Sequence, residues 1–219
     1  MDQHAELAIL NGVGPRMRAL IGQVTPVRIV AHLPLRPVLS AAIQELHECL
    51  HRHAGFAAIQ SATIGLADYR NLIVRLYGFC LPLEAAAAVR PDRSKWLVDD
   101  LTTLGLKRPL HALPKCSCIP RLDSAHLRPG ALYVAEGSAL GSCEFARGLD
   151  RTFGKDDSGG RQFFIDRGPK TGEARRGRPT QLSAARSEPC ARAEIIKGAI
   201  EAFAVFEHWL NGWSTTAYG

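Results

Sequence analysis

Apolar residues recur at helical spacing along most of the chain, and the first clear pattern follows the first 39 residues. Ser40 is a candidate N-cap, and the apolar residues Ile43, Leu46 and Leu50 come after it at intervals of three or four positions. This spacing places them on one face of a helix, where they would pack on a core. Gly55 is expected to end this helix.

The next pattern is longer and runs from Ala67 to Ala88. Pro82 lacks a backbone donor and is expected to kink the helix, and Pro91 is expected to stop it. The predicted apolar side comprises Leu72, Ile73, Leu76, Phe79, Leu83 and Ala87.

Two further helices are predicted in the middle of the chain. A helix is expected from about Arg128 to Phe153, with Pro129 in its first turn, where a missing N–H is tolerated. The proline-containing stretch Pro109–Pro120 is expected to be a connection. Before that connection, a second, amphipathic helical segment is predicted, which ends at Gly105. Its apolar positions are Trp96, Leu97, Leu101 and Leu104.

The C-terminal part contains a polar stretch and then a strong helix. Gly154–Gly160 is expected to be a loop, and Phe163 and Phe164 are expected to pack onto the core. Arg167–Pro189 is polar and rich in arginine. The last helix is predicted over Ala191–Trp209, with the apolar positions Ile195, Ile196, Ala199, Phe203, Phe206 and Leu210.

These patterns predict an all-α fold, a single-domain helical bundle, since no strand alternation and no internal repeat accompanies them. We expect the domain over residues 40–212, a poorly ordered extension over 1–39 and a tail over 213–219. Four arginines and no acid lie between Arg16 and Gln44, a composition that a transit peptide or a misassigned start codon would share.

Composition narrows the class of protein. A chain of 219 residues with 46% hydrophobic and 22% charged residues is typical of a soluble globular domain. The formal net charge of +6 is compatible with an anionic ligand or an acidic protein partner. No basic run with interleaved aromatics indicates nucleic-acid binding, and no apolar run has the length of a membrane span. We therefore expect a cytoplasmic protein without a nucleic-acid or membrane partner.

The cysteines are expected to be free thiols in a reducing compartment, because their spacing matches no zinc pattern and the chain needs no disulfide scaffold. The pair Cys116 and Cys118 is a weaker candidate for a redox or metal pair. The six positions are Cys49, Cys80, Cys116, Cys118, Cys143 and Cys190.

The stretch LHECLHRHAGF contains the H-E-x-x-H pattern of zinc proteases. His47 and His51 would share a helical face and bind the metal, with Glu48 as general base. No third ligand stands where the known forms of this motif place one, so the zinc interpretation is weak. The alternative is that His51 and His53 face solvent near a helix end, where the helix dipole favours them.

The stretch YVAEGSALGS is unusual because it places Gly137 and Gly141 on one face of a predicted helix. A glycine inside a helix costs about 1 kcal/mol relative to alanine, so two of them need a reason. One reason is close packing of two helices. The other is that a flat, bulky ligand approaches the helix backbone at the glycines, with Ser138 beside them.

Longer stretches carry a more specific signal. In order along the chain they read LHECLHRHAGF, ADYRNLIVRLYGFCLPLEAA, RSKWLVDDLTTLGL, IPRLDSAHLRPGALYVAEGSALGS, GRQFF and IIKGAIEAFAVFEHWL. From about Ala41 to Leu210 the chain thereby resembles the heme oxygenase family, in particular its bacterial, biliverdin-producing branch associated with bacteriophytochromes.

The resemblance implies an all-α fold that holds heme between a proximal and a distal helix. His47 matches the proximal histidine of the family pattern, with Leu50 three positions on, and is expected to be the axial ligand of the heme iron. The glycines of the distal helix fall on Gly137 and Gly141, with Ser138 between them. These three residues are the expected catalytic wall, and the two glycines also border the heme.

The family's reaction implies the cofactors and partners. Oxygen and electrons from an external reductant open the heme to biliverdin, carbon monoxide and ferrous iron, so heme is both cofactor and substrate. The implied electron donor is a ferredoxin or a reductase, and a phytochrome is the implied recipient of the product.

Two further features of the sequence bear on how the heme propionates are bound and on whether the chain is catalytically active. Ten Lys/Arg and five Asp/Glu lie between Arg151 and Arg192, and Arg161 is a candidate propionate partner, the alternative being a solvated arginine. Residues 171–190 lack the aromatic-containing helix that is usual in the family. This departure leaves a non-catalytic heme- or bilin-binding protein of the same fold as the alternative function.

Overall fold

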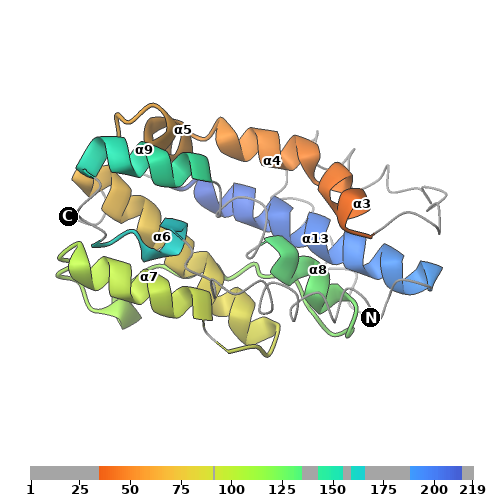
Figure 1. Ribbon diagram of the computed structural model, residues 1–219. Helices are drawn as coiled ribbons and strands as arrows, with labels where there is room; N and C mark the ends of the chain where they lie inside the picture. Colours follow the sequence, from red (N-terminus) through yellow and green to blue (C-terminus); the bar gives the residue numbers. More distant parts are fainter. Residues whose placement is uncertain (1–34, 91, 135–142, 155–158, 166–187, 214–219) are drawn as a thin grey trace, which may run out of the picture.

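The computed structural model of the chain describes residues 35–90, 92–134, 143–154, 159–165 and 188–213 (Figure 1). Within these ranges the chain forms α-helices and a short 3-10 helix but no β-strand, which confirms the predicted all-α class. No helix in the same ranges is both long enough and apolar enough to cross a membrane.

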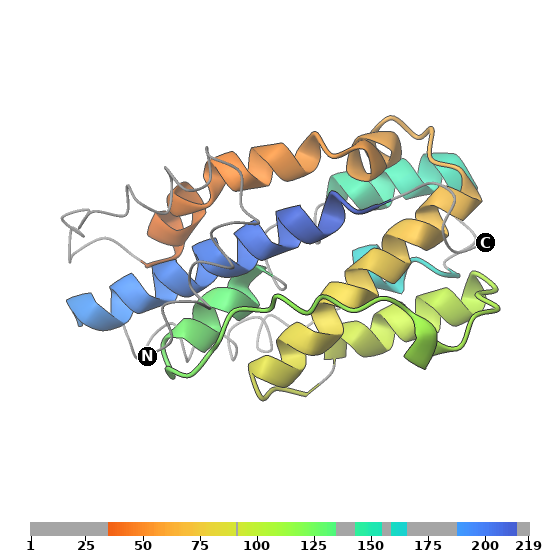
Figure 2. The ribbon, with the colours of Figure 1, turned by 180° about the vertical axis from the view of Figure 1, so that it is seen from behind.

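Helix α13 (Pro189–Leu210) runs through the middle of the molecule and contacts helices on both of its sides (Figures 1 and 2). Its partners are α3 (Leu35–Ala42), α4 (Gln44–His51), α6 (Leu66–Ala86) and α8 (Leu127–Tyr133).

The remaining helices contact α6 or one another. Helix α7 (Asp92–Thr103) lies against α6, α5 (Ala54–Gln60) lies against α9 (Cys143–Phe153), and α10 (Gln162–Ile165) touches α7 and α9. The 3-10 helix η1 (Leu110–Ala112) lies in the connection from α7 to α8.

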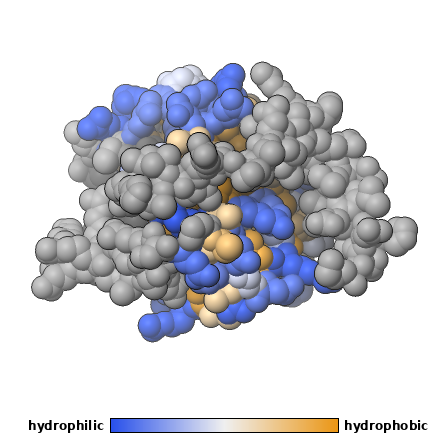
Figure 3. All heavy atoms as spheres, turned by 90° about the vertical axis from the view of Figure 1, so that its right-hand side faces the viewer, coloured by the Kyte–Doolittle hydropathy of each residue, from blue (hydrophilic) through white to orange (hydrophobic). Residues whose placement is uncertain are grey.

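The apolar faces predicted from spacing do form the core. All the apolar positions predicted for α6 and α13 are buried, and so are Leu97, Leu101, Phe163 and Phe164. The observed bounds of α6 and α13 differ from the predicted ones by no more than two residues at either end. Seen from the right-hand side of Figure 1, polar residues cover the upper edge of the molecule, and apolar and polar residues are interspersed below them (Figure 3).

The two ends of the predicted domain need correction. Helix α3 begins at Leu35 rather than after Ser40, and the side chains of Leu35 and Leu39 are only 3% and 0% exposed. The boundary expected at residue 39 was therefore wrong, since the core includes α3. At the other end, Trp213 packs against the core, so the domain reaches at least that residue.

The expected helix end at Gly55 was also wrong. Helix α4 ends at His51, and Gly55 lies within the first turn of a new helix, α5. The N-cap of α5 is His53, whose side chain accepts a hydrogen bond from the Gly55 backbone. A histidine is not among the usual N-cap residues, which is why sequence signals did not indicate this start.

Two buried carboxylates fix the starts of other helices. Glu84 of α6 accepts hydrogen bonds from the backbone N–H groups of Arg93 (2.7 Å) and Ser94 (3.2 Å) at the start of α7. Asp100 of α7 accepts from the backbone N–H groups of Gln162 (2.7 Å) and Phe163 (2.9 Å) of α10. The carboxylates satisfy N–H groups that have no partner within a helix. Burial raises the pKa of Asp100 to about 6, against the opposing effect of these two bonds.

Glycine allows α8 and α13 to touch through their backbones. A Cβ atom on Gly130 would collide with the carbonyl oxygen of Ile195, and one on Gly198 would collide with the carbonyl oxygen of Leu127. Since each glycine faces the backbone of the other helix, the crossing has no room for a side chain on either of them. This close contact sets the position of α8, from which the chain continues towards α9.

Candidate functional site

Two of the predicted histidines form a stripe along α4. The ring centroids of His47 and His51, one helical turn apart, are separated by 4.5 Å. The ring of His51 also stacks on Phe145 of α9, with centroids 5.3 Å apart and planes inclined by 20°. We call His47 and His51 the histidine stripe. The stacking on Phe145 shows that the ring of His51 is directed towards α9.

His53 is a structural residue. Its Nε2 lies 3.1 Å from the carbonyl oxygen of Leu210 at the end of α13, and its Nδ1 accepts from the Gly55 N–H at 3.3 Å. Because a carbonyl can only accept, Nε2 carries the proton and the ring is neutral. Burial lowers the pKa of His53 below its ordinary value of 6.5, although the bond to Leu210 acts in the opposite direction. The expectation of a solvent-facing His53 was therefore wrong, and both of its ring nitrogens are occupied.

The neutral His53 ring predicts a loss of stability in acid. Its folded pKa lies below the unfolded value of 6.5, so the unfolded chain takes up the proton first and stability falls as the pH drops below 6.5. We expect the urea midpoint of unfolding to fall between about pH 7 and about pH 5. His53→Asn keeps an N-cap acceptor but does not titrate, so its midpoint should fall less. Equal pH dependence of the two proteins would contradict this role.

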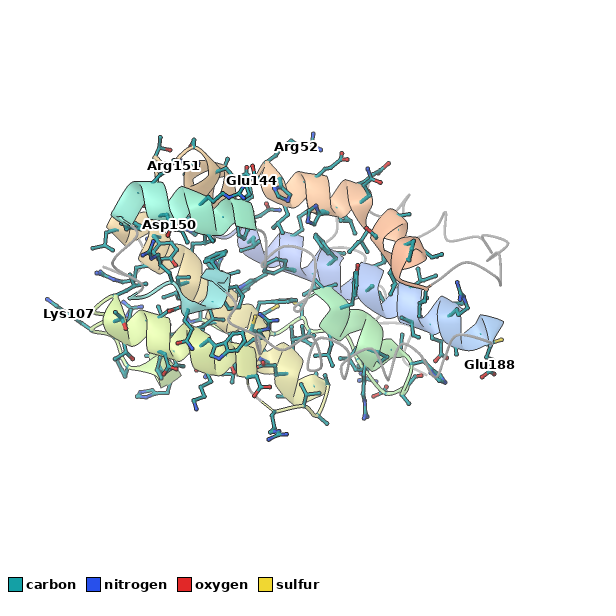
Figure 4. The ribbon with its side chains drawn as sticks, viewed as in Figure 1. Arg52, Lys107, Glu144, Asp150, Arg151 and Glu188 are labelled. Atoms are coloured by element: carbon teal, nitrogen blue, oxygen red, sulfur yellow. The ribbon has the colours of Figure 1, made fainter. Side chains whose placement is uncertain are left out.

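His51 is anchored by α5 and α9. The amide Nε2 of Gln60 lies 2.8 Å from Nδ1 of His51, and an amide nitrogen can only donate. The carbonyl oxygen of Gln60 accepts in turn from Nη2 of Arg151 at 2.6 Å. Burial and the neighbouring His47 lower the pKa of His51, while Glu144 raises it. Figure 4 shows Glu144 and Arg151 on α9, along the side of the molecule formed by α4 and α5.

His47 lies at the edge of the core. It is partly buried, whereas Leu46 and Leu50 on the adjacent face of α4 are 5% and 1% exposed. Glu48, the base expected for a zinc site, is exposed and accepts a hydrogen bond from the Gln44 side chain at 3.3 Å. Within the described ranges no three His, Cys, Asp or Glu side chains come close enough to hold a metal ion. The site is therefore a pair of histidines beside apolar side chains.

The predicted distal residues Gly137, Ser138 and Gly141 lie outside the described residues. The ends of their segment are placed, because α8 ends at Tyr133 and α9 begins at Cys143. Helix α8 packs on α13, as α4 does, and α9 contacts the histidine stripe through Phe145. Residues 135–142 therefore connect α8, which packs on α13, with α9, which contacts the histidine stripe.

Arg161 is buried in an ion pair. Its side chain is 2% exposed, and its Nη1 lies 3.0 Å from Oδ1 of Asp150 on α9. Its Nη2 donates to the carbonyl oxygen of Gly154 at 2.9 Å. The solvated arginine considered from the sequence was therefore wrong. Because both terminal nitrogens hold the chain around α9 and α10, these contacts lend no support to the expected propionate role, which stays a prediction.

The ring of His51 is held by two side chains that were not predicted from the sequence, Phe145 and Gln60. Phe145 occupies an apolar position of a predicted helix, but nothing in the local pattern indicates that it meets a histidine of α4. Gln60 was overlooked because Gly55 was taken as a helix end, so α5 was not predicted. The one available signal was the amphipathic pattern around Phe145.

Three comparisons with known proteins, against family models, curated proteins and solved structures, found no match for this chain.

Proposed function

We propose that this chain is a heme oxygenase that binds heme through His47 and cleaves it to biliverdin, carbon monoxide and ferrous iron. The observation that supports it most is the place of His47, partly buried next to a second histidine on a helix that packs on α13. A neutral imidazole beside apolar side chains is a common source of the proximal ligand of heme iron. The order of motifs that resembles the family adds independent support.

The residues of the proximal side have separate tasks in this proposal. His47 would present a ring nitrogen to the iron, and Leu46 and Leu50 would keep α4 fixed on the core. His51, which Gln60 holds, would limit the rotation of the neighbouring His47 ring. Heme, when bound, supplies the iron that reacts with oxygen and the porphyrin that is cleaved.

The distal residues are proposed from the sequence. Gly137 and Gly141 would let the plane of the heme approach the backbone, and Ser138 would lie beside the oxygen-binding side. Small residues at these positions leave space for oxygen and for water that delivers protons.

Charge supports the proposed electron donor. The chain has a formal net charge of +6, and Lys107 and Lys115 are exposed. A positive surface favours encounter with an acidic donor such as a ferredoxin or a reductase. The product biliverdin would then be available to a phytochrome in the same compartment.

Hemin titration of the purified chain tests this proposal. We expect one hemin per chain with a Soret band, and biliverdin after addition of ascorbate in air. Absence of a saturable Soret change would overturn the proposal. A Soret band without biliverdin would instead identify a non-catalytic heme- or bilin-binding protein, the alternative that the departures in residues 171–190 suggest.

Replacing His51 by alanine is expected to weaken hemin binding about 10–100-fold, the usual effect of losing a residue that orients a metal ligand. The position of the Soret band at saturating hemin should stay that of the wild type, because His47 remains. Titrations followed in the Soret region measure both quantities. His111→Ala, at an exposed histidine of η1, is the matched control and should bind as the wild type. Unchanged affinity in His51→Ala would show that this ring does not position His47.

A further inference from the structure

The histidine stripe has the spacing of a chelating pair. His47 and His51 are one helical turn apart on α4, and their ring centroids are separated by 4.5 Å. Residues four positions apart lie one above the other on the same face of a helix, so both rings can reach one ion. Both residues are partly exposed, so an ion in solution has access to this face of α4.

The separation of the two rings fits a particular coordination geometry. A metal–imidazole bond of about 2.1 Å places the ring centroid roughly 3.2 Å from the ion. Two centroids 4.5 Å apart then subtend an angle of about 90° at that ion. This is the angle between neighbouring ligands of octahedral and square-planar ions, whereas tetrahedral zinc requires a wider one of about 109°. The pair therefore suits nickel(II) or copper(II) better than zinc.

His51 is held in a form that can bind a metal ion. Burial and the neighbouring His47 lower its pKa, against the opposing effect of Glu144, so the ring is neutral at pH 7, as a metal ligand must be. Its Nδ1 lies 2.8 Å from the side-chain amide of Gln60, which leaves Nε2 for the ion. An imidazole that binds through Nε2 carries its proton on Nδ1, and the Gln60 amide can accept that proton's hydrogen bond by turning its oxygen towards the ring.

The surroundings of the pair favour a cation but supply no third protein ligand. Two charged groups shift the pKa of His51: His47, which is uncharged once it binds a metal, and Glu144 of α9, which is negative (Figure 4). Within the described ranges no third His, Cys, Asp or Glu comes close enough to join the pair, so water would complete the coordination. Nickel and copper accept such mixed nitrogen and oxygen ligands.

We propose that, in the heme-free chain, His47 and His51 together bind one divalent nickel or copper ion through a ring nitrogen of each, with water at the remaining coordination positions. This site goes beyond the heme oxygenase function, although both use the histidine stripe. Because metal binding is measured without hemin, it succeeds or fails independently of the hemin titration.

Calorimetric titration of the full chain with nickel chloride, without hemin, tests the site. We expect saturable binding of one ion per chain. Loss of a residue that only orients a ligand costs about 10–100-fold, so loss of one of the two ligands in His47→Ala or His51→Ala should weaken binding at least about tenfold. The matched control is His208→Ala, because His208 is exposed on α13 and has Ala204 and Gly212 four positions away. This control should bind as the wild type.

Electron paramagnetic resonance of the copper complex counts the ligands. The wild type should show hyperfine splitting from two imidazole nitrogens, and His51→Ala from one. Three outcomes would overturn the proposal: no saturable nickel binding, equal nickel binding by a His51→Ala variant whose circular dichroism matches the wild type, or a wild-type copper spectrum with a single imidazole nitrogen.

Discussion

Replacing His47 by alanine is expected to remove specific hemin binding from a protein that remains folded. His47 is partly buried at the edge of the core, so truncation leaves the packing of Leu46 and Leu50 intact. Loss of a residue that only orients a metal ligand costs about 10–100-fold in affinity, so loss of the ligand itself should cost at least about 100-fold. The measurement is a hemin titration in the Soret region, with circular dichroism to check the fold.

Added imidazole distinguishes a lost iron ligand from a lost fold. If His47 is the axial ligand, imidazole should occupy the vacated space and restore a Soret band like that of the wild type in His47→Ala. The smaller effect expected for His51→Ala provides the comparison within the same stripe. Wild-type affinity and spectrum in His47→Ala would eliminate this residue as the ligand.

Replacing Gly198 by alanine is expected to destabilise the fold by about 3 kcal/mol, the upper part of the range for overpacking. The new methyl group would collide with the carbonyl oxygen of Leu127, and a backbone atom of a packed helix cannot move aside as a flexible side chain can. For a chain of this length the thermal midpoint should fall by roughly 6–12 °C. Differential scanning calorimetry or urea unfolding measures the change.

Gly55→Ala is the matched control for the crossing of α8 and α13. A Cβ on Gly55 would make ordinary contacts of 3.4 Å with the methyl groups of Leu72, and alanine favours the helical conformation over glycine. Its stability should be unchanged or slightly increased. If Gly198→Ala is as stable as Gly55→Ala, the close approach of the two helices does not limit the fold.

The long helices were predictable because their pattern is local. In α6 and α13 the apolar residues repeat with the helical period, and every one of the predicted positions is buried. The region around α3 to α5 was harder, since apolar spacing continues through it while the helix is interrupted at Ile43 and again at Arg52 and His53. The start of α5 depends on the ring of His53, whose second bond is to Leu210 at the far end of the chain.

The candidate site also combines a residue chosen from the sequence with contacts that only the fold reveals. The resemblance singled out His47 among three neighbouring histidines, and its role as iron ligand stays a prediction. Contacts made by the other two could not be derived from the sequence, because Phe145 on α9 and Leu210 on α13 are brought to them only by folding. The buried pair of Arg161 and Asp150 was missed for the same reason.

Residue order along the chain was thus sufficient for the all-α class and for the core positions of α6 and α13, whereas the assignment of His47 as iron ligand stays a prediction. Contacts between helices were needed to show that Glu84 and Asp100 hold the starts of other helices and that the ring of His53 is bound to Leu210. They also placed Gly198 against a backbone. Helical periodicity arises within a few residues, whereas a hydrogen-bond partner or a close approach exists only once remote helices have packed together.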